Sequence, residues 1–127
     1  MKTLYLLFSH KLTAEQQADA RQSLGVEDFV ALPDDLQRLF SNVPPDTDRL
    51  KPYLKPLRKW LKDNARPGDP VLIQGDFGAT YQLVRFAKKQ GLLPLYATTS
   101  RQSVDEPQPD GSVVTKRTFK HCRFRKY

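Results

Sequence analysis

The stretch LIQGDFGATY, residues 72–81, carries the signals that decide the fold of this chain. Together with Val71, its first residues form an apolar run with little polar alternation, which is typical of a parallel strand buried on both faces. Gly75 and Gly78 permit a tight turn and a close approach of the backbone. From Ala79 onward the apolar residues recur at helical spacing. The stretch therefore predicts a strand, a turn and a helix, and open α/β sheets bind ligands at the carboxyl ends of such strands.

The composition bounds the class of protein. A chain of 127 residues with 39% hydrophobic residues is expected to form one domain, residues 1–127. The single cysteine excludes an internal disulfide and indicates a reducing cytoplasm. No apolar stretch approaches the roughly 18 residues of a membrane span, and the apolar run at residues 4–8 is shorter than the roughly 7–15 residues of a secretory signal. We expect a cytoplasmic protein with no membrane partner.

The rest of the chain alternates strand and helix patterns. Beside the opening stretch, strands are predicted at residues 3–8, 28–32 and 93–98. Helices are predicted from the capping box Thr13-x-x-Gln16 to about Leu24, from Pro33 to about Phe40, from Thr47 or Asp48 to about Leu61, and over residues 79–90. This order predicts an open, mainly parallel α/β sheet with helices on both faces.

The third helix and the C-terminus depart from a regular pattern. Leucines at positions 50, 54, 57 and 61 predict one buried helical face. Pro56 removes a helical hydrogen bond, so it should kink or restart this helix. Residues 112–119 and 121–125 are predicted to form a C-terminal β-hairpin that adds antiparallel edge strands to the sheet.

The net charge of +7 is concentrated near the C-terminus. Residues 116–127, KRTFKHCRFRKY, carry six Lys or Arg and no acidic residue. Such a patch attracts polyanions, and it equally suits a solvated edge hairpin whose lysines discourage aggregation. A second basic face, where solvation is favoured over ligand binding, lies on the predicted third helix and consists of Lys51, Lys55, Arg58, Lys59 and Lys62.

Three polar segments follow predicted parallel strands and are therefore expected at one edge of the sheet. They are Ser9-His10, residues 76–80 and residues 98–101. Hydroxyl groups, free helix-terminal N–H groups and a cation at this edge suit an anionic, nucleotide-like ligand, although each group also fits an ordinary cap or turn. The predicted ligand-binding residues, including three from the basic C-terminus, are Asp76, Phe77, Gly78, Ala79, Thr80, Thr98, Thr99, His121, Arg123 and Arg125.

Common nucleotide and metal motifs do not occur in the sequence. The glycines do not match G-x-G-x-x-G, and there is no G-K-[ST] of a P-loop. Asp76 would repel a phosphate, so we expect it to cap a helix or to accept a hydrogen bond from a ribose hydroxyl. His10, His121 and Cys122 do not show metal-type spacing. No metal and no cofactor are therefore predicted.

The residues present can support a metal-free cleavage of RNA-like substrates. A ribose 2′-hydroxyl that is held in line attacks the adjacent phosphate, and the protein supplies positioning and charge stabilisation. Ser9, Thr99 or Arg101 can fill this role, with His10 as the proton carrier.

The basic C-terminus offers further groups for a phosphate. Arg123 and Arg125 alternate with Phe124, so both are expected on one strand face, where they can hold phosphates together with Arg101. His121 fits either a general acid or base or a surface histidine.

Four segments together resemble a known family. They are LYLLFSHKLT (residues 4–13), VLIQGDFGATYQLV (71–84), PLYATTSR (94–101) and FKHCRFRKY (119–127). In these segments the chain resembles the small CRISPR-associated proteins of the Csx group that act as stand-alone ring nucleases in type III systems. That family is similar in fold to the CARF domain, so the resemblance implies a Rossmann-like (CARF-like) sheet.

The resemblance also implies an activity. It implies recognition of cyclic oligoadenylate, above all cyclic tetra-adenylate, and its metal-independent cleavage to linear adenylates with 2′,3′-cyclic phosphate ends. This reaction would switch off the antiviral signal. A ligand with near two-fold symmetry implies a homodimer. Ser9 and Arg101 are the positions that correspond to the hydroxyl and basic residues typical of related enzymes, and His10 completes the predicted catalytic set.

Two other functions remain open. A non-catalytic sensor or sponge for cyclic oligoadenylate would use the same pocket. A general RNA- or DNA-binding protein would use the basic hairpin, but no aromatic-rich RNA motif of a recognised type is present. Long nucleic acid is therefore the partner that we rank last.

Overall fold

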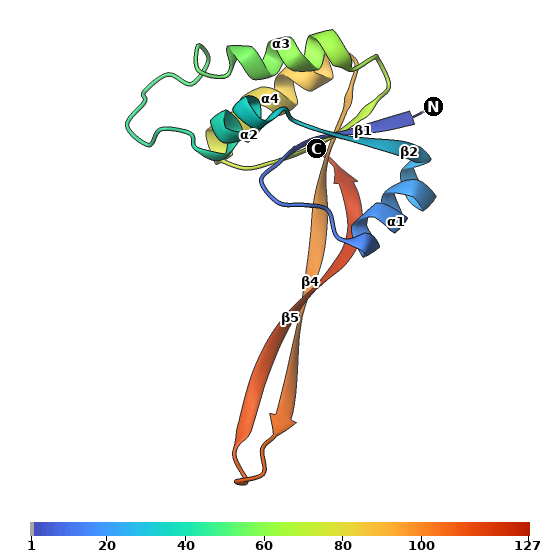
Figure 1. Cartoon of the computed structure of the whole chain (residues 1–127), viewed down its shortest axis with the longest axis vertical. Helices are drawn as coiled ribbons and strands as arrows, with labels where there is room; N and C mark the ends of the chain where they lie inside the picture. The colour runs from blue at the N-terminus through green and yellow to red at the C-terminus, as the bar shows by residue number, and fades with distance from the viewer. Residues whose placement is uncertain (1) are drawn as a thin grey trace.

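The computed structural model describes residues 2–127 as a five-stranded sheet with helices on both faces (Figure 1). The elements are β1 (Lys2–Phe8), α1 (Ala14–Leu24), β2 (Val26–Ala31), α2 (Asp34–Ser41), α3 (Lys55–Asn64), β3 (Pro70–Gln74), α4 (Phe77–Lys89), β4 (Leu93–Pro107) and β5 (Val113–Lys126). The strand order is β2-β1-β3-β4-β5, in which β1 to β4 are parallel and β5 is antiparallel to β4. The prediction of an open, mainly parallel sheet with helices on both faces is confirmed.

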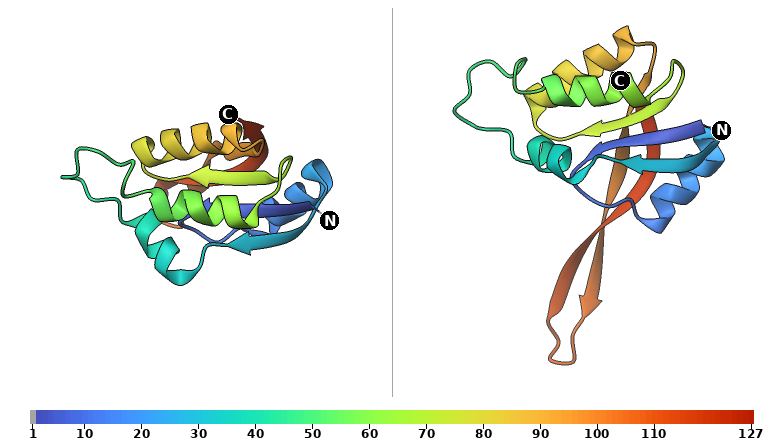
Figure 2. Two further views of the ribbon diagram at one scale, coloured as in Figure 1. Left: turned by 90° about the horizontal axis from the view of Figure 1, so that it is seen from above. Right: turned by 45° about the horizontal axis from the view of Figure 1, so that its top comes forward.

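The central strand β3 is buried on both faces, as its apolar run predicts. Leu72 packs in the core under α1, whereas Val71 and Ile73 pack in the core under α2, α3 and α4. All three side chains are fully buried. Figure 2 shows α1 on one side of the sheet and the other helices on the opposite side.

The local signals for α1 and α4 are confirmed. The Thr13 side chain accepts a hydrogen bond from the Gln16 N–H, and the Gln16 side chain accepts one from the Thr13 N–H. Gly25 ends α1 with a φ of 67°, a left-handed conformation that favours glycine. Helix α4 begins at Phe77, two residues before the position that its apolar spacing predicts.

The predicted start of the third helix is wrong. Helix α3 begins at Lys55, and the residues between Asp48 and Lys55 form turns and irregular chain instead of a helix. Pro56 lies in the first turn of α3, where its missing N–H has no helical partner to lose. Pro56 therefore lies at the start of α3, with no earlier helix to kink or restart. Of the predicted buried face, Leu57 and Leu61 lie in α3 and are fully buried. Leu54 is fully buried and Leu50 is partly buried, but both precede the helix.

The C-terminal hairpin was predicted with the wrong strand boundaries. Residues 113–126 form one strand, β5, which pairs along its length with a β4 that continues to Pro107, well beyond the predicted end at residue 98. The turn lies at residues 108–112, where Gly111 has a φ of 86° and Asp110 accepts hydrogen bonds from Ser112. No turn interrupts the strand at Lys120.

The irregularity near Lys120 is a bulge. Thr98 pairs with Arg123 and Thr99 pairs with His121, so Cys122 is an extra residue in β5. The outer halves of β4 and β5 extend away from the rest of the molecule as a two-stranded arm, residues 99–120 (Figure 1).

Candidate functional site at the carboxyl edge of the sheet

The carboxyl ends of β1, β3 and the sheet portion of β4 meet at one edge, as predicted. In this strand order the chain reverses its winding direction between β1 and β3, which is where open α/β sheets form a ligand crevice. Phe8 pairs with Gln74, so Ser9 and Gly75 leave neighbouring strands at the same level. The Gln74 side chain accepts a hydrogen bond from the Ala97 N–H at 2.8 Å, which ties β4 to this edge.

The turn between β3 and α4 is organised by two side chains. Asp76 Oδ2 accepts a hydrogen bond from the Ala79 N–H at 3.0 Å, so Asp76 caps the helix, one of its two predicted roles. Thr80 Oγ1 accepts a hydrogen bond from the Gly75 N–H at 3.1 Å. Within residues 2–127, the N–H groups of Phe77 and Gly78 have no protein acceptor. These two donors at the helix N-terminus are available to an anion.

Two aromatic side chains stand exposed on the first turns of α4. Phe77 is 94% exposed, and Tyr81, one helical turn later, is 62% exposed. Phe77 is among the predicted ligand-binding residues, but the apolar spacing of α4 gives no signal that its side chain faces outward. A single exposed aromatic is common on protein surfaces, but Phe77 lies beside two free N–H donors.

Ser9 and His10 line a separate hollow on the α1 side of the edge. The Ser9 hydroxyl lies 2.9 Å from the Ser41 hydroxyl, and the His10 ring packs edge-on against Phe8 with 5.4 Å between ring centroids. The hollow measures about 530 Å³ and is lined by Leu6, Phe8, Ser9, His10, Lys11, Leu12, Gln17, Phe29, Ala31, Leu32, Asp34 and Gln37. Residues 75–80 do not line it, so the edge presents two neighbouring parts and not one pocket.

The segment 98–101 continues as a strand and does not form a loop at the edge. Thr98 Oγ1 donates to the Arg123 carbonyl and accepts from the Arg123 N–H, at 3.0 and 3.2 Å. Arg101 pairs with Phe119 in the arm and its guanidinium lies 5.6 Å from the Phe119 ring centroid. Because an antiparallel strand rises about 3.4 Å per residue, Arg101 lies about 10 Å further along β4 than Thr98. Within one chain, Arg101 therefore stands apart from Ser9 and His10.

The bulge at Cys122 turns His121 toward α1. The His121 side chain is only 4% exposed, its Nε2 lies 2.7 Å from Asp19 Oδ2, and its ring packs against Phe124. Its Nδ1 is buried without a hydrogen-bond partner in the described chain. Burial acts to raise the pKa of Asp19, but hydrogen bonds from Ser23 and His121 and nearby positive charge outweigh it, so the pKa lies below its usual value. The arrangement ties β5 to α1.

Arg123 and Arg125 are both exposed and flank the buried Phe124, as their alternation predicts. Arg125 donates to the Tyr96 hydroxyl at 3.0 Å and its guanidinium lies over the Tyr96 ring. These two cations are near the edge of the sheet, whereas the His121 imidazole is enclosed between β5 and α1.

The fold and its polar edge define an open α/β protein with a candidate anion site at β1 and β3. The chain belongs to the family described as "Uncharacterized protein MJ1673 family", whose model matches residues 2–125. It is similar to Uncharacterized protein MJ1673 of Methanocaldococcus jannaschii, with 54% identity over 127 residues that cover 100% of this chain and 98% of the relative. No solved structure shows a significant match.

Two further findings concern the described residues. None of their helices is long and apolar enough to cross a membrane. No group of three or more His, Cys, Asp or Glu side chains in residues 2–127 is placed to hold a metal ion.

Proposed function

We propose that this protein is a ring nuclease that binds cyclic oligoadenylate, with cyclic tetra-adenylate as the first ligand to test, and opens it to linear products. In this proposal the sheet is a CARF-like, Rossmann-like domain and the reaction ends type III CRISPR antiviral signalling. The observation that carries the proposal is the carboxyl edge at β1 and β3, where two free N–H groups of α4 stand beside the exposed Phe77 ring.

The chemistry of an adenylate ring matches the groups at this edge. Its phosphates need hydrogen-bond donors and cations, which the N–H groups of Phe77 and Gly78 and the exposed Arg123 and Arg125 supply. Its bases need an aromatic face, and the exposed Phe77 ring is one. The edge therefore offers a partner for each part of the ligand.

We further propose that the functional unit is a homodimer joined through the arm. An isolated two-stranded hairpin is marginally stable in water, yet this arm exposes Val104, Val113, Val114 and Phe119. A second copy of the chain would cover this apolar surface.

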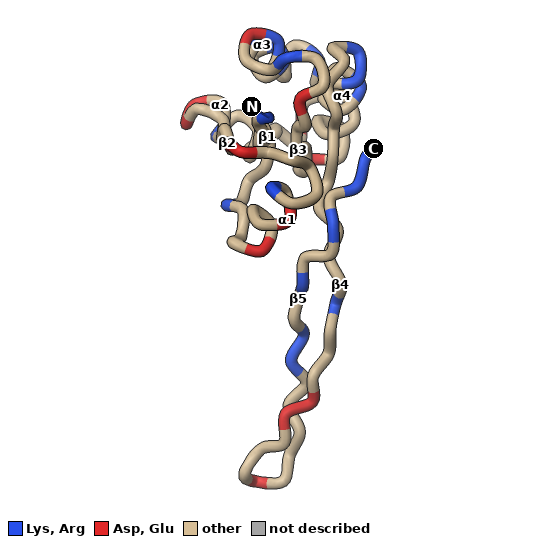
Figure 3. Tube along the Cα trace, turned by 90° about the vertical axis from the view of Figure 1, so that its right-hand side faces the viewer, with Lys and Arg blue, Asp and Glu red and all other residues tan. Residues whose placement is uncertain are grey.

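The distribution of charge along the arm supports a dimer in which the arms of the two copies pack antiparallel to each other. Strand alternation and the β4–β5 register place Arg101, Arg117 and Asp105 with Phe119 and Val113 on one face of the arm. The two arginines lie nearer the sheet and Asp105 lies nearer the tip. Figure 3 shows basic residues along the inner part of the arm and acidic residues nearer its tip. In a two-fold pair of antiparallel arms, Asp105 of one copy meets the arginines of the other.

The proposed reaction is an internal transesterification. The ribose 2′-oxygen forms a bond to the adjacent phosphorus, and the bond from phosphorus to the 5′-oxygen breaks, which leaves a 2′,3′-cyclic phosphate and a 5′-hydroxyl. His10 carries the proton, Ser9, held by its contact with Ser41, positions the ribose, and Arg101 stabilises the charge on the phosphate. Because Arg101 lies about 10 Å further along β4 than Thr98, a ring that contacts it extends from the edge to the base of the arm.

The test is incubation of the purified protein with labelled cyclic tetra-adenylate in EDTA. We expect linear products with 2′,3′-cyclic phosphate ends. Arg101→Ala should cut more slowly than Lys59→Ala, whose side chain is 73% exposed and pairs with Asp63 on α3. Equal rates for the two variants would remove Arg101 from the site. A ring that stays bound and intact would overturn the nuclease.

That last outcome describes the second candidate function, a sensor or sponge that holds the ring without cutting it. The separation of Arg101 from Ser9 and His10 is the observation that favours this candidate.

A further inference from the structure

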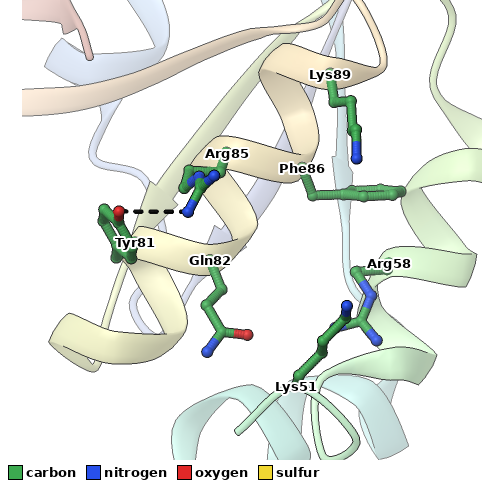
Figure 4. A pocket seen from close by; sticks show the side chains of 7 residues that line it. All are labelled: Lys51, Arg58, Tyr81, Gln82, Arg85, Phe86 and Lys89. Atoms are coloured by element: carbon green, nitrogen blue, oxygen red, sulfur yellow. Dashed lines mark hydrogen bonds between the residues drawn. The ribbon is translucent and has the colours of Figure 1, made fainter.

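A basic groove runs between α3 and α4 on the face of the sheet opposite α1 (Figure 4). It measures about 520 Å³, and its lining contains four cationic side chains and no acidic one. The lining residues, which we call the α3–α4 groove, are Lys51, Arg58, Tyr81, Gln82, Arg85, Phe86 and Lys89.

The four cations of the groove are not neutralised by the protein. Within residues 2–127, none of Lys51, Arg58, Arg85 and Lys89 forms a salt bridge. By contrast, Lys59 on the outer side of α3 pairs with Asp63 at 2.6 Å. The sequence favours solvation over ligand binding for the basic face of the third helix. The fold brings Lys51 and Arg58 of that face opposite two cations of α4, which no spacing along the sequence reveals.

The groove also contains aromatic and hydrogen-bonding groups. In Figure 4 the Phe86 ring projects from α4 toward α3 and lies between Lys89 and Arg58. The Arg85 guanidinium lies over the Tyr81 ring, 5.6 Å from its centroid, and donates to its hydroxyl. Gln82 adds a side-chain amide. Cations that follow a phosphate backbone, together with aromatic faces for unstacked bases, are the two components of single-strand binding sites.

We propose that the α3–α4 groove binds a short single-stranded oligonucleotide. Arg58 and Arg85 contact backbone phosphates, and Lys51 and Lys89 add positive charge at the two sides of the groove. A base stacks on the exposed Tyr81. The segment 81–89 spans about 12 Å along the helix, which limits the site to a few nucleotides. A base is read through its aromatic face and not through its edge, so the site tolerates different sequences.

This site is independent of the proposed ring nuclease. It lies along the outer face of α3 and α4, and neither Ser9, His10 nor Arg101 belongs to its lining. Oligonucleotide binding in the groove therefore does not depend on ring cleavage, and the two activities can be measured separately.

The experiment is fluorescence anisotropy with labelled six-nucleotide RNA and DNA at several salt concentrations. The groove variant is Arg58→Gln/Arg85→Gln. The matched control is Lys62→Gln/Lys88→Gln, which removes two charges from the same helices at exposed positions outside the groove. Thermal unfolding of all variants checks that they fold.

We expect the groove variant to lose two phosphate contacts. Each contact in a single strand contributes about 0.7 to the slope of log K against log salt, so the slope should become shallower by about 1.4 and the affinity at 0.1 M salt should fall about 25-fold. The control should stay within about two-fold of the original protein. Tyr81→Ala should weaken binding without a change of slope, because stacking is not electrostatic.

Three results would overturn the groove as an oligonucleotide site. They are a protein that binds neither strand at micromolar concentration, a control variant that loses as much affinity as the groove variant, and displacement of the strand by inorganic tripolyphosphate at equal phosphate concentration. Retained binding of cyclic tetra-adenylate by the groove variant would show that the two sites are separate.

Discussion

Asp76 illustrates how a single side chain at the candidate site also supports the fold. Its carboxylate accepts a hydrogen bond from the Ala79 N–H and so satisfies one of the free donors of α4. We predict that Asp76→Ala lowers the free energy of unfolding by about 1 kcal/mol, measured by urea denaturation. Asp76→Asn keeps an acceptor oxygen and serves as the control. Equal stability of Asp76→Ala and the original protein would show that the cap contributes nothing.

The pair of Asp19 and His121 gives a second prediction, which concerns pH. Because the pKa of Asp19 is lowered in the folded protein, its carboxylate stabilises the fold above its usual pKa of about 3.9, and this contribution is lost as the pH falls through the lowered value. Asp19→Asn should therefore lose less stability than the original protein between about pH 5 and about pH 2. Urea denaturation across this range measures the difference.

Asp46→Asn is the matched control for this experiment. It removes the same charge from an exposed loop, so its stability should follow the pH profile of the original protein. If Asp19→Asn also follows that profile, the contact with His121 does not couple protonation to folding.

Single-residue roles were predictable where the cause is local. The Thr13 cap and the Asp76 cap depend on residues three positions away, so their spacing is visible in the sequence. The burial of His121 was not visible, because it depends on a bulge at Cys122 and on an aspartate 102 positions earlier in the chain. The exposure of Phe77 likewise depends on how α4 packs on the sheet.

At the scale of elements, the turn from β3 to α4 packs directly on α2. A Cβ atom added at Gly75 would lie 2.7 Å from Cζ of Phe40, a residue that is 2% exposed. Phe40 cannot move without disturbing the core under α2, α3 and α4. Gly75 is therefore required for the close approach of this turn to α2, and not for an unusual backbone angle.

This packing predicts that Gly75→Ala destabilises the protein by about 1–3 kcal/mol through overpacking. In a Phe40→Leu background the smaller side chain relieves the clash, so Gly75→Ala should cost less there than in the original protein. A double-mutant cycle by urea denaturation measures both costs. If Gly75→Ala costs the same in the two backgrounds, the clash with Phe40 is not the cause.

The two element errors have different physical origins. Pro56, a local determinant, sets the start of α3, whereas the pairing of β4 with β5 sets the turn of the hairpin. Residues 48–54 carry helix-compatible leucines but fold as turns, because Pro56 can begin a helix more easily than continue one. Lys120 was taken as a turn between strands, yet pairing with Ser100 keeps it within β5.

At the scale of the molecule, the parallel sheet was predictable and the completed site was not. Alternating apolar runs and amphipathic helices leave few topologies, so the order of elements indicates the sheet. The carboxyl edge follows from that order, and Ser9, Gly75 and the end of β3 meet there. Arg101 departs from the edge because β4 continues into the arm, and the sequence has no marker for the length of that strand.

The arm supplies the last prediction, which concerns assembly. On one face of the arm, Phe119 and Val113 accompany Arg101 and Arg117, which form no salt bridge within residues 2–127. The other face carries Val104 and Val114 together with the internal pair Lys116–Glu106 at 3.1 Å. The Phe119 face combines apolar area with charges of both signs that can pair across a two-fold axis, so we expect this face to join two copies. Phe119→Thr/Val113→Thr should convert the dimer to a monomer in light scattering after size exclusion. Val104→Thr/Val114→Thr, which replaces the two exposed apolar side chains of the opposite face, should leave it dimeric. Threonine retains β propensity, so both variants preserve the strands. A monomeric original protein at tens of micromolar, or dissociation only by the second pair, would contradict this interface.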